Sequence, residues 1–143
     1  MNNLNFIKRT FVFVLLLAFI SCAHIRTTNE EKMLTLASAL TKLSAAVEST
    51  VRYKNPPPGL SDEELLALAT QHDPTLLQQF ADYTVRIYQE NRHSIVLICT
   101  KDGDRALLED TNCTPEVDRH HWEETPPKPC EFTLSVPAVC RDQ

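Results

Sequence analysis

The sequence predicts an α+β fold in which helices come first and a small antiparallel sheet follows. Helix-capping patterns and a helical apolar stripe lie in the N-terminal half, whereas a β-branched run and an Asp-Gly turn lie in the C-terminal half. Four cysteines in the C-terminal half predict two disulfides. The predicted helices cover residues 29–54, 62–71 and 74–90, and the predicted strands cover residues 94–100, 105–110 and 131–136.

The first predicted helix begins at a capping box, in which Thr28 caps the helix and Glu31 reaches back. It ends near Lys54, because Asn55 precedes Pro56 and a residue before proline avoids helical geometry. Packing of its apolar stripe on this chain's own sheet is favoured, and a helical arm that contacts another subunit is the alternative. The stripe consists of Met33, Leu36, Leu40, Leu43 and Val47.

The second predicted helix begins at another capping box, Ser61 to Glu64. Asp73 and Pro74 then have the form of a helix cap followed by proline at the first helical position. Residues 83–87 also alternate like a strand. A helical projection separates apolar and polar side chains over more than four turns, so a helix is predicted over residues 74–90.

The sheet is predicted from residue 94 onward. The short apolar run from Ile95 to Ile98 is typical of a buried strand. Asp102-Gly103 predicts a tight hairpin with a type I′ turn, which places Cys99 opposite Ala106. Residues 114–129 are rich in proline and predict an irregular segment before the last strand.

Cys99, Cys113, Cys130 and Cys140 are 14, 17 and 10 positions apart, so they contain no close pair of the kind that chelates zinc. In an exported chain an even number of cysteines predicts disulfides. Three pairings are possible. The hairpin disfavours a Cys99–Cys113 bond, because the chain would have to fold back sharply after residue 110.

The N-terminus has the form of an export signal: Lys8 and Arg9 precede an apolar run of about 10 residues, too short to span a bilayer. The run ends in Phe19-Ile20-Ser21-Cys22, which resembles a bacterial lipobox. The resemblance implies that residues 1–21 are removed and that Cys22 is acylated, palmitate included. It also implies an envelope lipoprotein with a short tether over residues 22–28, ahead of one domain at 29–143. Ala23 follows the cysteine. In such lipoproteins an aspartate at this position often means retention in the inner membrane, so its absence resembles an outer-membrane address, facing the periplasm.

Charge and glycine content exclude several function classes. Without Lys8 and Arg9 the 14 basic residues fall to 12 against 19 acidic ones, a net charge of −7. This charge disfavours nucleic acid, whose binding depends on neutralising phosphates. Gly59 and Gly103 are the only glycines, too few for a P-loop or a dinucleotide fingerprint.

The densest polar cluster contains His120, His121 and two glutamates around Trp122. Adjacent histidines in an irregular loop point apart, so neither a metal site nor any other cofactor is expected. Trp122 either pins this loop onto the sheet or serves with His120 and His121 as the anchor of a partner-binding loop.

The sequence contains no nucleophile elbow and no Cys-x-x-Cys redox pair, and we expect no enzyme. The favoured function is a non-catalytic, lipid-anchored interaction or assembly component of an envelope complex. The alternatives are a periplasmic inhibitor or immunity protein and, third, a small envelope hydrolase or metal-binding protein. Partner identity and oligomeric state are open.

Overall fold

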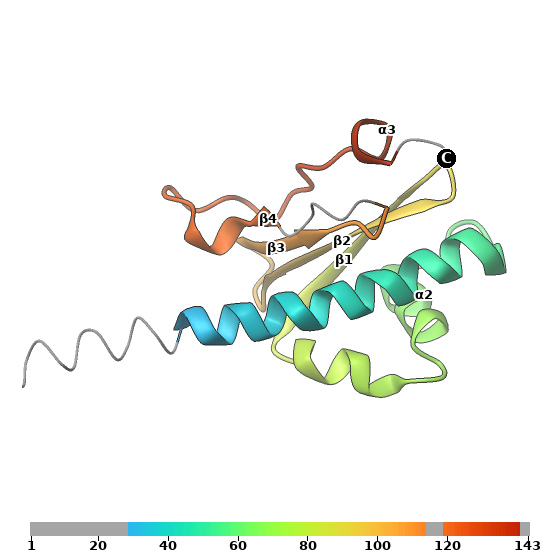
Figure 1. The fold of residues 1–143 in the computed structure, drawn as a ribbon, viewed down its shortest axis with the longest axis horizontal. Helices are drawn as coiled ribbons and strands as arrows, with labels where there is room; N and C mark the ends of the chain where they lie inside the picture. The colour runs from blue at the N-terminus through green and yellow to red at the C-terminus, as the bar shows by residue number, and fades with distance from the viewer. Residues whose placement is uncertain (1–28, 114–118, 141–143) are drawn as a thin grey trace, which may run out of the picture. The chain divides into compact units, whose positions relative to one another are not determined.

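The computed structural model describes residues 29–113 and 119–140 (Figure 1). The chain divides into two compact units, Met1–Thr35 and Leu36–Gln143. In the first unit the described residues, 29–35, are helical. The predicted signal peptide, Cys22 and the tether lie outside the described residues, as does the Thr28 cap.

A long helix covers residues 29–49 and continues as the π-helical segment η1 (Thr50–Lys54). The helix stops at Asn55, whose φ of 47° is left-handed, a conformation that asparagine tolerates. Pro56 follows, and the residue before a proline avoids helical geometry, so the helix does not resume. The predicted helix of residues 29–54 is therefore confirmed. The stripe residues Leu36, Leu40, Leu43 and Val47 are all buried within the chain, as predicted for packing on its own sheet.

The second helix, α2 (Asp62–Ala69), begins at the predicted capping box. The Glu64 backbone N–H donates to Ser61 Oγ at 3.2 Å, and the Ser61 N–H donates to Glu64 Oε2 at 2.8 Å. The 3₁₀ helix η2 (Pro74–Phe80) follows, capped by Asp73. Within the part of the chain that the structure describes, no helix has the length and apolar character needed to cross a bilayer.

Four antiparallel strands form one sheet in the order β1-β2-β3-β4. The predicted strands of residues 94–100 and 105–110 are confirmed as β2 and β3, with Cys99 opposite Ala106. The turn before β3 is not type I′, because only Gly103 in it has a positive φ. The four strands are β1 (Tyr83–Glu90), β2 (His93–Thr100), β3 (Ala106–Asp110) and β4 (Arg119–His120).

The predicted helix of residues 74–90 is wrong in its second half, where residues 83–90 form β1. Its amphipathic pattern fits a helix locally, but strand β1 pairs with β2 along its whole length. Asn91 and Arg92, with φ of 51° and 64°, close a two-residue hairpin between the two strands. This non-local pairing outweighs the local helical preference.

The predicted strand of residues 131–136 is also wrong. β4 occupies the free edge of β3, through Leu108–His120 and Glu109–Arg119 pairing. The segment after Cys130 therefore runs over the sheet, and its Thr133 and Leu134 N–H groups donate to the Glu109 side chain rather than to a strand. It ends in the short helix α3 (Val136–Val139).

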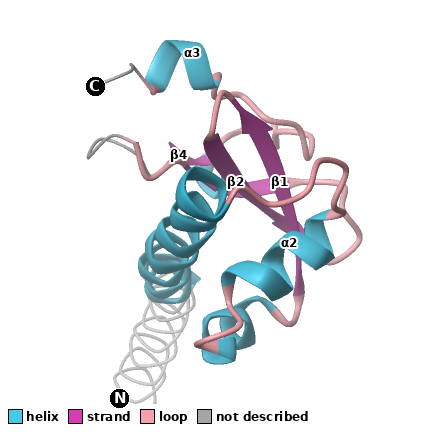
Figure 2. Ribbon diagram, turned by 90° about the vertical axis from the view of Figure 1, so that its right-hand side faces the viewer, coloured by secondary structure: helices cyan, strands magenta, loops and turns pink. Residues whose placement is uncertain are grey.

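The sheet lies between two layers. Residues 36–49 of the long helix and α2 cover one face, and the C-terminal segment covers the other (Figures 1 and 2). β2 is buried almost throughout because both of its faces are covered. On the C-terminal side, Leu97 and Cys99 pack against Cys130 and Phe132.

Two disulfides tie the C-terminal segment to the sheet, and the α+β fold with two disulfides is confirmed. Cys99 pairs with Cys130, and Cys113 pairs with Cys140. The disfavoured Cys99–Cys113 bond does not form. Both bonds hold the same layer, since each joins a cysteine in or just after a strand to one in the covering segment.

Candidate functional site

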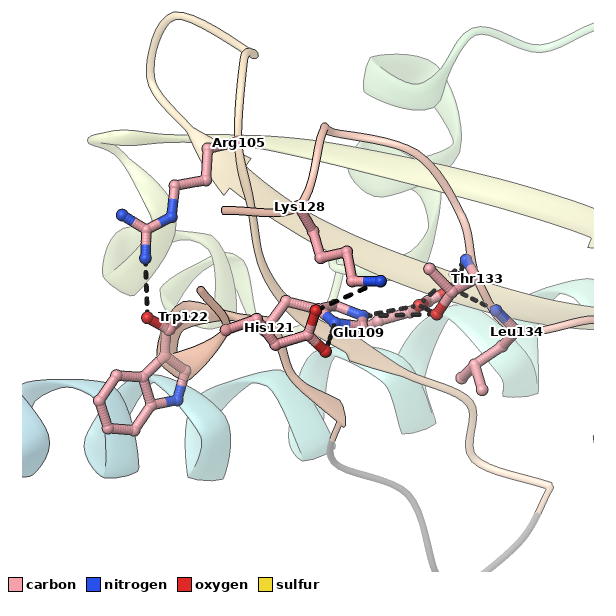
Figure 3. Close-up of polar contacts among 8 residues, drawn as sticks. Arg105, Glu109, His121, Trp122, Lys128, Thr133 and Leu134 are labelled. Carbon is pink, nitrogen blue, oxygen red and sulfur yellow. Dashed lines mark hydrogen bonds and ion pairs between the residues drawn. The ribbon is translucent and has the colours of Figure 1, made fainter. Parts of the chain in front are cut away.

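A buried carboxylate lies at the centre of the C-terminal half. Glu109 in β3 is 0% exposed. Its oxygens accept hydrogen bonds from the backbone N–H groups of Thr133 and Leu134, both at 3.0 Å, and from Thr133 Oγ1 at 2.6 Å (Figure 3). A buried carboxylate is tolerated when several donors replace its lost hydration. These bonds attach the covering segment to the sheet.

His121 lies between two carboxylates, the buried Glu109 and the partly exposed Glu124. Its Nε2 lies 3.1 Å from Glu109 Oε2, and its Nδ1 lies 3.1 Å from Glu124 Oε1. Both ring nitrogens thus face carboxylates. The residue is only 2% exposed, so the ring fixes the start of the segment around it.

Two further contacts hold the same segment, which we call the clamped loop (residues 119–130). Arg105 donates from Nη2 to the Trp122 carbonyl at 2.7 Å, and Lys128 Nζ lies 3.5 Å from Glu124 Oε2 (Figure 3). At its far end the loop is tied covalently by the Cys99–Cys130 disulfide. The clamped loop is therefore fixed at both ends and in the middle.

The structure brings the three predicted binding residues into the clamped loop, in different environments. Trp122 and His120 are half-buried, and their rings meet edge to face with centroids 6.4 Å apart. His121 instead turns inward to Glu109. The exposed part of the loop is Arg119, Glu123, Thr125, Pro126, Pro127, Lys128 and Pro129.

The chemistry of this network is that of a structural clamp. Thr133 Oγ1 donates to Glu109, and both nitrogens of His121 are engaged by carboxylates, so neither is directed at a substrate or a metal. Asp118, which the sequence places in the same polar cluster, lies outside the described residues. The burial of His121 leaves almost no surface that a substrate can reach.

A second buried polar cluster lies at the start of β2. His93 Nδ1 is 2.7 Å from Glu48 Oε1, and a ring nitrogen of His93 lies within 4.8 Å of the sulfurs of Cys113 and Cys140. Among the described residues this is the group of three whose types and spacing suit a metal. Both sulfurs are joined in a disulfide, however, and the ligand form of cysteine is the thiolate.

Sequence reasoning missed Glu109, Glu48 and His93. Glu109 follows two leucines in a short strand, and a charged residue in such a run is a usable signal of a buried network. Glu48 directly follows the stripe residue Val47, and Ser44 one turn before it is buried as well. That spacing extends the buried face of the helix to a carboxylate.

The pKa values of Glu124 and Asp62 are shifted in opposite directions. The hydrogen bond from His121 lowers the pKa of Glu124 below its usual 4.5, with help from Lys128. Burial raises the pKa of Asp62 at the start of α2, although hydrogen bonding to the Ile87 backbone and the charge of Arg86 oppose that rise. Glu124 thus stabilises the folded state in its charged form.

The lowered pKa of Glu124 predicts an acid-dependent contribution to stability. A carboxylate with a depressed folded-state pKa stabilises the protein above its unfolded value of 4.5, and this contribution disappears as the pH falls through the lower folded value. Glu124→Gln should therefore be less stable than the wild type at pH 6, and the difference should disappear as the pH falls below 4.5 and through the lower folded-state pKa of Glu124. Urea unfolding followed by the fluorescence of Trp122, the single tryptophan, measures both. Glu123→Gln, an exposed neighbour, is the control, and a constant difference across the range would contradict the expectation.

Comparison of this chain with protein-family models, with curated proteins and with solved structures finds no match. The functional conclusion therefore depends on the residues of this chain alone. Those residues offer a clamped loop with an exposed proline-rich surface, and a disulfide beside a buried imidazole.

Proposed function

We propose that this chain is a non-catalytic, lipid-anchored protein of the bacterial envelope that acts as an interaction or assembly component of a periplasmic or outer-membrane complex. Cys22, at the end of the lipobox-like Phe19-Ile20-Ser21-Cys22, supplies the anchor. Several acyl chains on one residue give stable membrane attachment, where one chain gives only reversible binding.

The clamped loop is the observation that carries the interaction role. It presents Glu123 and the run Thr125 to Pro129 to solvent beside the half-buried ring of Trp122. A loop that is already ordered loses less conformational entropy on binding than a flexible one. The buried Glu109–His121 pair supplies that order at the base of the loop.

The loop is tested by affinity capture of the lipidated protein from its own envelope. We expect Trp122→Ala to lose most of the specific partner, because buried aromatic anchors dominate interface energies at about 2 kcal/mol or more. Glu123→Arg, which changes only an exposed charge, should weaken capture as well. Tyr53→Ala removes an aromatic ring that is 74% exposed outside the loop, and it should have no effect.

Equal recovery of the same partners by the wild type and both loop variants would contradict the binding role of the loop. Thermal unfolding of each variant shows whether a loss of capture reflects a loss of folding. If the captured partner is an enzyme whose activity falls on binding, the function is that of a periplasmic inhibitor or immunity protein rather than that of an assembly component.

The anchor is tested separately by Cys22→Ser. We expect this variant to leave the membrane fraction or to remain unprocessed, whereas the wild type carries the mass of its acyl groups on Cys22. Intact-mass spectrometry and membrane fractionation measure both effects. An unmodified wild-type chain in the aqueous fraction would contradict the lipid anchor.

A further inference from the structure

The Cys113–Cys140 disulfide has polar neighbours on both sulfurs. Thr111 Oγ1 lies 2.9 Å from Cys113 Sγ and 3.3 Å from Cys140 Sγ. A ring nitrogen of His93 lies within 4.8 Å of the same two sulfurs. Cys113 is half-buried and Cys140 is buried, so an attacking group reaches Cys113 more readily.

His93 is held in place by a buried carboxylate. Glu48 is 4% exposed and binds His93 Nδ1 through Oε1 at 2.7 Å. Its other oxygen accepts hydrogen bonds from the Ser94 backbone N–H at 2.7 Å and from Ser94 Oγ at 2.8 Å. A carboxylate bound to an imidazole in this way fixes the orientation of the ring.

The Cys99–Cys130 disulfide is different. Cys99 is fully buried and packs with Leu97, Ala106 and Phe132. Across residues 29–113 and 119–140, no hydrogen bond to either of its sulfurs is present, in contrast to the bond at Cys113. The two bonds span similar lengths of chain, so the chain contains its own matched control.

We propose that Cys113–Cys140 is a reactive disulfide that exchanges with a dithiol reductant, and that His93 supplies the proton to the departing sulfur. A thiolate of the reductant attacks Cys113 Sγ and forms a mixed disulfide. The Cys113–Cys140 bond breaks, its electron pair moves to Cys140 Sγ, and His93 protonates that sulfur while Thr111 donates a hydrogen bond to it.

The second thiol of the reductant completes the exchange. It attacks its own sulfur in the mixed disulfide, so that the reductant leaves as a disulfide and Cys113 leaves as a thiolate. The proton lost by the second thiol returns through the imidazole. Two electrons have then moved from the dithiol to Cys113 and Cys140. The second thiol restores the proton that His93 gave to Cys140, and water protonates the Cys113 thiolate, which balances the proton that the first thiol released when it ionised. Glu48 acts as a positioning residue, since its hydrogen bonds go to His93 and Ser94 rather than to a sulfur.

The first measurement compares the two bonds in the wild-type protein. Native protein is treated with dithiothreitol, free thiols are trapped by alkylation at timed intervals, and the peptides are quantified by mass spectrometry. Thiol exchange is fastest where the sulfur is accessible and the leaving thiol is stabilised. We expect Cys113–Cys140 to be reduced at least about tenfold faster than Cys99–Cys130. Equal rates, or faster reduction of Cys99–Cys130, would overturn the proposal.

Exposure of Cys113 alone favours the same order, so His93→Gln separates the two causes. We expect this variant to slow reduction of Cys113–Cys140 by about tenfold or more, because a positioned acid is lost, with no change at Cys99–Cys130. His120→Gln, which removes a histidine of the clamped loop, should change neither rate.

Unfolding of the His93 variant is recognisable, because both disulfides would then be reduced faster. Thr111→Val is the second variant for that case, since it keeps the branched shape and removes only the hydroxyl beside the sulfurs. It should slow reduction of Cys113–Cys140 by about threefold to tenfold. An unchanged rate of Cys113–Cys140 reduction in folded His93→Gln would overturn the proposal and show that this disulfide is purely structural. If His93→Gln unfolds, an unchanged rate in Thr111→Val has the same meaning.

Discussion

Replacing Glu109 with alanine is expected to lower the free energy of unfolding by about 3–5 kcal/mol, the cost of breaking a buried pair by removing one partner. The substitution leaves His121 Nε2 without its carboxylate. It also leaves the buried N–H groups of Thr133 and Leu134 without their acceptor. Urea unfolding at neutral pH, followed by Trp122 fluorescence, measures the loss, because this tryptophan lies in the clamped loop.

The matched control is Glu123→Ala, an exposed carboxylate in the same loop, which should change stability by less than about 0.5 kcal/mol. Glu109→Gln provides a second comparison. It keeps the size of the side chain but places an amide donor against the donors of Thr133 and Leu134, so it should also be strongly destabilised. If Glu109→Ala loses less than about 1 kcal/mol, the clamp does not hold the segment.

The parts of the fold that were predicted correctly depend on local chemistry. The capping box of α2 needs only Ser61 and Glu64, three positions apart. The end of the long helix needs only Asn55 and the proline after it. For each of these features, the residues that determine it lie within one helical turn of one another, so the sequence alone is sufficient to predict it.

Strand β1 was mispredicted because the residues that select the strand lie outside its own segment of the chain. Residues 83–87 fit both a helical and an alternating pattern. What selects the strand is pairing with β2 and the packing of Arg86 and Tyr88 on Phe132, which stands far along the chain. Phe132 was itself assigned to a strand, although its segment crosses the sheet instead of joining it.

The candidate sites show the same limit. His121 meets Glu109 across 12 positions, and Thr133 meets it across 24. Glu48 and His93 are 45 positions apart. Sequence reasoning identified His120, His121 and Trp122 from their composition as a cluster, but not that His121 turns inward, because its partners come from other segments.

Loss of the Cys99–Cys130 disulfide is expected to cost about 3–4 kcal/mol. The bond closes a stretch of 31 residues, and the chain-entropy model assigns that stabilisation to the restriction of the unfolded chain. A double Cys99→Ala, Cys130→Ala variant removes the bond and leaves no serine hydroxyl in the core beside Leu97. Urea unfolding in the absence of reductant measures the change.

The double Cys113→Ala, Cys140→Ala variant separates chain entropy from packing. It opens a stretch of 27 residues, for which the same model gives nearly the same cost. Cys99 is fully buried whereas Cys113 is half-buried, so the first variant leaves the larger cavity in the core. We therefore expect the Cys99 variant to be the less stable of the two. A Cys99 variant as stable as the wild type would mean that hydrogen bonds alone hold the covering segment on the sheet. These are the bonds that Thr133 and Leu134 donate to Glu109 and the bond that Arg86 donates to the Cys130 carbonyl at 2.8 Å.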